Sequence, residues 1–292
     1  MGKTSAPIDY ESLIRLIHNR YDDMSRSHRE IATYLTQNPN EVAVRAVNSI
    51  SQSCGIHASS FVRFAQSLGF DGFKSLQEVF QQRLATAAPG FEARVYALNQ
   101  ELRSRSKRPE SDLLVDMVVS DAASIQSLLD EVDARDVARA GEIIGDADTV
   151  FLLGQLRSAP VVELIRYLLT MAGKKCTLLD PSGGLATHIA RTMGPNDVLF
   201  VVSFRFYANE VVSIVEEVAS QNRKIIALSD STLSPLAKSA DVLFAVHEHS
   251  GPLSRSITAP ICLAQAVALA TAARVQKSAE IPKIPSVTSK IK

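Results

Sequence analysis

Two polar segments of the chain carry residue types that bind anions. Gly154-Gln155-Leu156-Arg157-Ser158 and Ser203-Phe204-Arg205-Phe206-Tyr207 each follow an apolar run and open a helical pattern. An arginine fork, a serine hydroxyl and the amides at a helix N-terminus together suit a phosphate. One such segment alone is better explained by helix capping, but two at equivalent strand ends favour binding. We expect ligand contacts from Gly154, Gln155, Arg157, Ser158, Ser203, Arg205, Tyr207 and Ser256.

Residues 49–74 have the order of a helix, a tight turn and a second helix that a DNA reader needs. Gly55 tolerates the positive φ of such a turn. In the second helix Phe61, Phe64 and Leu68 recur at helical spacing, so one stripe faces a core and the other side faces outward. If this segment is considered alone, a solvated surface helix explains it equally well. The side chains expected to contact DNA are His57, Ser59, Ser60, Arg63, Gln66 and Lys74.

The elements around this pair predict an all-helical unit. Apolar periodicity predicts helices over residues 10–20, 26–36, 40–46 and 73–87, with a stop signal at Asn38-Pro39. We therefore expect a DNA-binding domain over residues 1–88. Pro89-Gly90 breaks it, and the charged segment that follows, to residue 112, is expected to be a linker.

From residue 113 the pattern changes to helices that alternate with short apolar runs. Such runs joined by helical crossovers predict a parallel sheet that is covered on both faces and binds ligands at its carboxyl edge. The sheet domain is expected over 113–276 and a flexible tail over 277–292. The expected strands are Thr149–Leu153, Cys176–Leu179, Val198–Val202, Ile225–Leu228 and Val242–Val246; the expected helices are Ser158–Ala172, Leu185–Met193, Ala208–Ser220 and Ser234–Ala240.

The composition narrows the class of protein. With 31 basic and 31 acidic residues among 292, the chain has no net positive charge to attract nucleic acid irrespective of its sequence. DNA affinity is therefore expected to depend on dimerisation. Three scattered cysteines and the isolated His247-Glu248-His249 run predict neither a disulfide framework nor a metal site. No cofactor is expected. The chain lacks an apolar signal region and an uninterrupted apolar span, the nearest being residues 259–273, so a cytoplasmic protein with no membrane partner is expected.

The motifs resemble a known family. Gly55 to Phe64, followed by Leu68-Gly69-Phe70-Asp71-Gly72-Phe73, is similar to the N-terminal domain of RpiR/MurR-type bacterial transcriptional regulators, and the sheet domain resembles their SIS (sugar isomerase) domain. The resemblance implies a helix-turn-helix domain followed by a five-stranded, Rossmann-like αβα sandwich, an α plus α/β fold. Leu156 stands where many members have a small residue, and the 203–207 segment resembles an arginine-bearing subgroup.

What the resemblance implies is a homodimeric or homotetrameric regulator that binds a palindromic double-stranded operator and senses a sugar phosphate or similar anionic metabolite. Two alternatives stay open. A sugar-phosphate isomerase would need a general base, for which Glu163 and Glu210 follow the two polar segments. An interaction module with a vestigial ligand site would need neither base nor effector.

Overall fold

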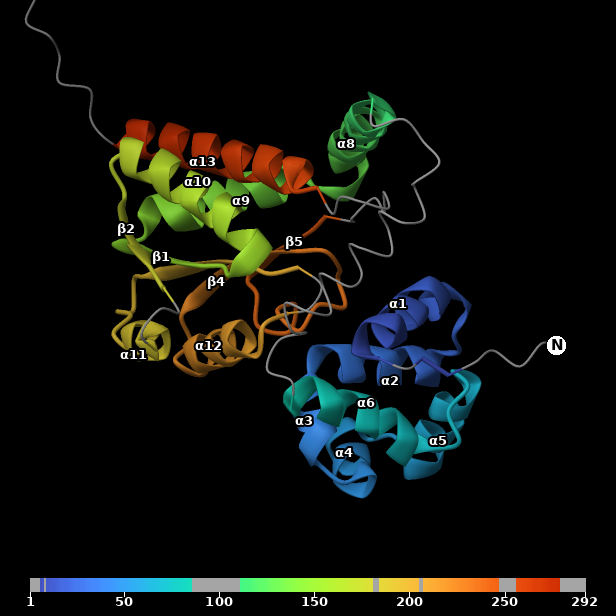
Figure 1. Cartoon of the computed structure of the whole chain (residues 1–292). Helices are drawn as coiled ribbons and strands as arrows, with labels where there is room; N and C mark the ends of the chain where they lie inside the picture. The colour runs from blue at the N-terminus through green and yellow to red at the C-terminus, as the bar shows by residue number, and fades with distance from the viewer. Residues whose placement is uncertain are drawn as a thin grey trace, which may run out of the picture.

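The computed structural model describes residues 6–7, 9–85, 111–180, 184–204, 207–246 and 256–278. The helical unit comes first in the chain, and the sheet unit follows residue 110 (Figure 1). Both the Arg103–Pro109 run and the His247-Glu248-His249 run lie outside the described residues.

The helical unit is built from short amphipathic helices that share one core. Buried aromatic and aliphatic side chains from all of them, from Tyr10 to Phe80, form a single cluster, and every described member of this cluster belongs to the helical unit. Pro39 occupies the first turn of its helix, where its missing N–H costs nothing. The helices are α1 (Tyr10–Arg20), α2 (Arg26–Gln37), α3 (Pro39–Val44), α4 (Val47–Cys54), α5 (Ala58–Ser67) and α6 (Phe73–Ala85), with the 3-10 turn η1 (Tyr21–Asp23) between α1 and α2.

The sheet unit holds five parallel strands in the order β2-β1-β3-β4-β5. The strands are β1 (Thr149–Leu153), β2 (Lys175–Leu178), β3 (Val198–Val202), β4 (Lys224–Ser229) and β5 (Val242–Ala245). The chain steps outward from β1 to β2 and then returns to the other side of β1 to form β3. The strand order therefore reverses between β1 and β3, the position where open parallel sheets bind ligands.

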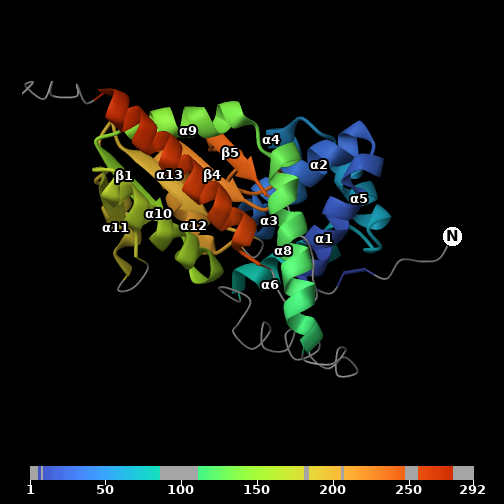
Figure 2. The ribbon, with the colours of Figure 1, turned by 90° about the horizontal axis from the view of Figure 1, so that it is seen from above.

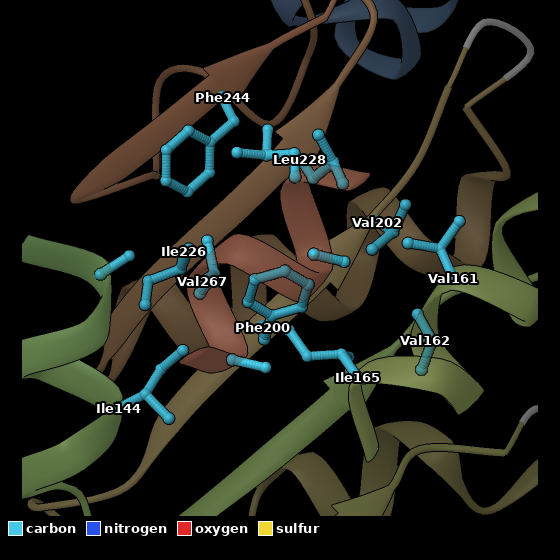
Figure 3. Close-up of a cluster of buried hydrophobic side chains, with 14 of the residues drawn as sticks. Ile144, Val161, Val162, Ile165, Phe200, Val202, Ile226, Leu228, Phe244 and Val267 are labelled. Carbon is cyan, nitrogen blue, oxygen red and sulfur yellow. The ribbon is translucent and has the colours of Figure 1, made fainter. Parts of the chain in front are cut away.

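Side chains of alternate strand residues bury the two faces of the sheet. On one face Leu152, Phe200 and Ile226 belong to a core covered by α9 (Ala134–Asp146), α10 (Ala159–Met171) and α13 (Thr258–Ser278), as Figure 3 shows for part of this cluster. On the other face Phe151 and Leu199 pack beneath α11 (Ala186–Ala190) and α12 (Asn209–Ser220). The expected fold, a parallel sheet sandwiched between helical layers, is confirmed.

Helix α8 (Ser111–Glu131) lies at the side of the sheet unit against the first part of α13 (Figure 2). The Thr258 hydroxyl at the start of α13 donates to the Asp121 carboxylate of α8 at 2.8 Å, and Leu128 packs against the sheet core. α13 is long and apolar enough to cross a membrane by length and composition, yet it packs along α9 and α10. Its apolar character is therefore that of a helix lying over a core.

Some expected boundaries are wrong. The helix predicted over 234–240 is a run of turns, in which the Ser234 hydroxyl accepts from the Leu236 amide at 3.2 Å. These turns connect β4 to β5 without a crossover helix. The helix predicted over 185–193 is shortened to Ala186–Ala190. α8 begins at Ser111 and α13 continues to Ser278, and the expected limits of the domains, linker and tail stay a prediction.

Side-chain contacts join the helical unit to the sheet unit. The His18 ring of α1 lies 3.4 Å from the Ser231 hydroxyl, just after β4. The Lys238 ammonium donates to the Asn38 side chain at 2.9 Å and to Glu216 of α12 at 2.8 Å. The surface of the helical unit near α1 and α2 therefore touches loops on the side of the β4 carboxyl end.

Candidate nucleic-acid interface and effector site

The turn between α4 and α5 has the backbone of a helix-turn-helix. Gly55 ends α4 at φ +66°, and its amide donates to the Ser51 carbonyl, as does the amide of Ile56 at 3.1 Å. A Cβ at residue 55 would meet nothing within 4 Å. The glycine is therefore required for its left-handed backbone and not for space.

Helix α5 divides into a buried stripe and an outward face as its spacing predicts. Phe61, Phe64 and Leu68 are fully buried, and the Phe61 ring meets Phe73 edge-on with centroids 5.6 Å apart. On the outward side Ser59, Arg63 and Gln66 are exposed, as are His57 and Lys74 at the flanks, while Ser60 is half-buried. The five exposed predicted DNA contacts are thus accessible from outside, and a contact with DNA stays a prediction for all six.

Residues that sequence reasoning missed hold α3 and α4 in place. The Arg45 guanidinium bonds the Glu41 carboxylate at 2.8 Å and the side chains of Ser49 and Ser53, so it braces α3 against α4. The Gln77 amide of α6 donates to the carbonyls of Val42 and Arg45, both at 2.7 Å. The spacing of four residues between Glu41 and Arg45 is a local signal, whereas the partners of Gln77 lie 35 and 32 residues away in sequence and could not be found from spacing.

The positive charge of Arg63 affects a histidine that packs against the buried side of α5. His28 of α2 packs edge-on against Phe64 at 5.5 Å, and burial together with the positive charge of Arg63 lowers the pKa of His28. His28 is therefore neutral near pH 7. The positive charge on the outward face of α5 comes from Arg63.

The two polar segments of the sheet unit meet at the reversal of strand order. β1 pairs with β3 in parallel, from Val150 opposite Val198 to Leu153 opposite Val201, so the loops after them start side by side. Arg157 of the first loop lies over the Phe204 ring of the second, 4.9 Å from its centroid. The Gln155 amide donates to Glu210 of α12 at 2.8 Å. The loops are joined directly by these two contacts.

Neither serine of these loops acts as a helix cap. Ser158 precedes α10, yet its side chain makes no capping hydrogen bond, and it is only 4% exposed. Ser203 is buried and lies well before α12, whose N-cap is Ala208. Helix capping therefore does not account for a serine at either position.

Tyr207 forms a buried pair that sequence reasoning did not connect. Its hydroxyl donates to the Asp230 carboxylate, after β4, at 2.6 Å. Burial, and then the charge of Asp230 and this hydrogen bond, raise the pKa of Tyr207 well above its ordinary value, so the phenol stays protonated. The Ser229 hydroxyl donates to the Ser203 carbonyl at 2.8 Å, which ties the same loop to β4 a second time.

The backbone of the first loop is tight. A Cβ on Gly154 would lie 2.5 Å from Val162 Cγ2, so the missing side chain lets the loop lie directly on α10. Leu156, the next residue but one, has φ +56°, a left-handed conformation that costs an L-residue roughly 1–2 kcal/mol, and its side chain is 56% exposed. Strain of this kind persists where the surrounding structure enforces it, as at ligand-binding loops.

Ser256, another predicted ligand residue, has a capping role. The Ser256 hydroxyl accepts from the Thr258 amide at 3.2 Å and so caps α13. Arg205 lies outside the described residues. A hollow of about 650 Å³ lies elsewhere, on the helical unit between α2 and the end of α4, lined by Arg26, Arg29 and Tyr34 among others. Ligand contact by each residue of the predicted set stays a prediction.

The two residues considered as general bases are engaged elsewhere. Glu163 accepts from Arg166 at 2.7 Å on the half-exposed surface of α10. Glu210 accepts from Gln155. No group of three or more potential metal ligands occurs in the part of the chain that the structure describes.

Both units match known protein families. Residues 11–87 match the helix-turn-helix domain of the rpiR family, and residues 143–270 match the SIS domain. The fold and the two matches define a helix-turn-helix regulator with a sugar-isomerase-type sheet domain. The chain carries an RpiR-family helix-turn-helix domain followed by a SIS domain, and the resemblance noted in the sequence is confirmed.

Individual relatives agree with this assignment. An HTH-type transcriptional regulator of Caldanaerobacter subterraneus is 23% identical over 240 residues, which span 79% of this chain and 78% of the relative. The sugar isomerase domain of an RpiR transcription factor from Sphaerobacter thermophilus is 25% identical, with a TM-score of 0.54 over 56% of this chain and 92% of that one. NanR of Vibrio vulnificus, solved in complex with ManNAc-6P, shares the fold at 18% identity and a TM-score of 0.54, over 92% of this chain and 97% of that one.

The strain at Leu156 predicts a stabilising substitution. Leu156→Gly should raise the free energy of unfolding of the sheet unit by about 0.5–1 kcal/mol, because glycine accepts positive φ and the side chain is largely exposed. Urea unfolding followed by circular dichroism measures the change. Asn222→Gly is the control, since asparagine already tolerates its φ of +54° and should gain less. Equal gains at both positions would show that Leu156 is not strained.

Proposed function

We propose that this protein is a transcriptional regulator that binds a palindromic operator through α5 and is controlled by a phosphosugar-like effector at the loops after β1 and β3. On this proposal it governs genes of sugar or carbohydrate metabolism. The observation that carries the effector proposal is the junction of the two loops at the reversal of strand order, with two buried serines that cap no helix. The relatives named as HTH-type regulators support a non-enzymatic role.

The effector side of the proposal has a chemical basis. Ser158 and the amides at the start of α10 supply donors to a phosphate, and Arg157 supplies a positive charge within the same loop. The ManNAc-6P bound by NanR supports a phosphorylated sugar as the class of effector. Glu163 is occupied by Arg166, which disfavours it as the base of an isomerase.

A chain of contacts supports communication between the two ends of the molecule. Tyr207 belongs to the second loop and bonds Asp230, which is next to Ser231; Ser231 in turn touches His18 of α1. An effector that shifts the second loop therefore acts on the surface where the helical unit rests. The effector controls DNA binding only to the extent that its affinity differs between the arrangement of the protein that binds DNA and the arrangement that does not.

Arg63→Ala should weaken binding to a specific duplex by about tenfold or more, because an arginine contact to a base edge contributes about 1–3 kcal/mol. The probe is a duplex selected by the wild-type protein from a random library, and the measurement is fluorescence anisotropy at fixed salt. Arg135→Ala is the control, because it removes the same charge from an exposed ion pair of the sheet unit. Unchanged affinity of the Arg63 variant would remove α5 as the recognition helix.

Ser158→Ala should weaken effector binding by about tenfold, since a buried donor to the phosphate is lost. Calorimetric titration of the full chain with N-acetylmannosamine 6-phosphate, glucose 6-phosphate, fructose 6-phosphate and inorganic phosphate measures it. Ser220→Ala, at the exposed end of α12, is the control. Silence of the wild type toward every sugar phosphate would contradict the effector proposal, and turnover of any of them would revive the isomerase.

Tyr207→Phe tests the chain of contacts. It removes the hydrogen bond to Asp230 and should bring the effector-induced change in DNA affinity close to onefold, even when the effector is saturating. DNA affinity with and without saturating effector is the measurement. Tyr167→Phe, at an exposed tyrosine of α10, keeps the full response. A full response in the Tyr207 variant would exclude this route.

A further inference from the structure

Asn209, the first residue of α12, carries a buried oxygen atom that has no hydrogen-bond partner among the described residues. This atom is the side-chain Oδ1, which is closed off from solvent. Buried side-chain oxygens are paired in the great majority of folded proteins, because an unpaired one loses its hydrogen bonds to water without replacement. A donor supplied by a second molecule would explain an acceptor of this kind.

The neighbours of Asn209 place it at the proposed effector site. Tyr207, two residues earlier, belongs to the loop after β3. Glu210, the next residue, accepts from Gln155 of the loop after β1 at 2.8 Å. A side chain in the first turn of a helix leans toward the helix N-terminus, which here is the end of the loop after β3. Asn209 therefore begins α12 where the two loops meet.

Neither helix capping nor core packing accounts for this oxygen. An asparagine at the start of a helix commonly bonds an amide of the first turn. The N-cap of α12 is Ala208, however, and Asn209 Oδ1 accepts from no described amide. Asn209 and Ser213 lie one turn apart on the same side of α12, and Ser213 is exposed, so this side does not face a core. The helix therefore does not use the amide oxygen for its own stability.

We infer that Asn209 Oδ1 accepts a hydrogen bond from a hydroxyl or an amide N–H of the effector and so selects a phosphorylated sugar over a phosphate ester that lacks such donors. The inference deepens the proposed function and rests on it for the presence of an effector at these loops. Asn209 is not among the ligand residues that the sequence predicts.

The chemistry of the site divides between the two parts of such an effector. Arg157, the Ser158 hydroxyl and the amides at the start of α10 are donors and suit the phosphate oxygens. An amide oxygen is an acceptor only, so it bonds the hydroxyls of a sugar and not the phosphate oxygens, which are acceptors as well. The Glu210 carboxylate, the neighbouring acceptor, is already engaged by Gln155. Asn209 is therefore suited to distinguish sugars by the donors that they carry.

A metal ion fits this oxygen less well than a sugar hydroxyl does. A hard cation takes several oxygen ligands, usually with carboxylates among them. No group of three or more His, Cys, Asp or Glu side chains that could hold a metal ion occurs in the described part of the chain. A single neutral amide oxygen instead matches a single neutral donor.

The test compares two probes on the full chain by calorimetric titration. Methyl phosphate carries the phosphate without a sugar hydroxyl, and the second probe is the sugar phosphate that the wild type binds most tightly among those titrated above. Asn209→Leu should lower the ratio of the sugar-phosphate affinity to the methyl-phosphate affinity about tenfold, because the sugar donor then faces an apolar side chain. Ser158→Ala should weaken the binding of both probes and keep this ratio.

Two further variants separate the hydrogen bond from other effects. Asn209→Asp keeps an acceptor oxygen and should hold the ratio within about threefold, although its negative charge weakens the binding of both probes. Ser213→Leu is the matched control, because it introduces the same side chain at an exposed position one turn later in α12, and it should bind both probes as the wild type does. Circular dichroism verifies that each variant folds.

An unchanged ratio in the Asn209→Leu variant would overturn the inference, as would an equal loss of affinity for both probes, which would place the residue at the phosphate. A ratio lost in Asn209→Asp as well would show that the amide donates and would overturn the acceptor role. In these cases the wild type still binds a sugar phosphate, so the proposed function stands. Silence of the wild type toward every sugar phosphate would contradict the proposed function and, with it, this inference.

Discussion

The parallel pairing of β1 with β3 is the constraint on which the sheet unit depends. Its register is fixed at the amino end by Asp197, whose carboxylate accepts from the Thr149 amide at 2.9 Å and from the Gly194 amide at 2.6 Å. With the amino ends fixed, both strands finish together, and their two loops begin as neighbours. The contact of Arg157 with Phe204 and the bond between Gln155 and Glu210 follow from this alignment. A slip of one residue would turn the buried side chains to the wrong faces and separate the loops.

The same edge of the sheet is connected to the helical unit through β4. The loop after β3 bonds β4 through Ser229 and Tyr207, and the residues that follow β4 touch α1. The order of elements thus places one short route between the effector loops and the helical unit. Helix α8 is fixed to the start of α13 by the hydrogen bond between Thr258 and Asp121.

Much of the fold could be predicted from sequence because its signals are local. Apolar runs gave each strand within one or two residues, and Gly55 with the spacing of Phe61, Phe64 and Leu68 gave the helix-turn-helix. The connection over 234–240 was mistaken for a helix because its Ser-Pro start is typical of one. The hydrogen bond between Tyr207 and Asp230 could not be predicted, because contacts between the ends of different strands depend on strand register and not on neighbouring residues in the sequence. The burial of Asn209 Oδ1 was equally hidden, since burial is decided by what the rest of the chain covers.

The order of the two cores along the chain has a consequence for protein synthesis. Among the described residues, the core of the helical unit runs from Tyr10 to Phe80, and the ring contact between these two residues joins its first helix to its last. A ribosome therefore releases everything this unit needs before β1 has been translated, and local helical contacts form far faster than parallel strand pairings. If the proposed function holds, a chain that terminates after α6 would keep the helical unit and lack the unit proposed to bind the effector, so no metabolite could regulate that fragment.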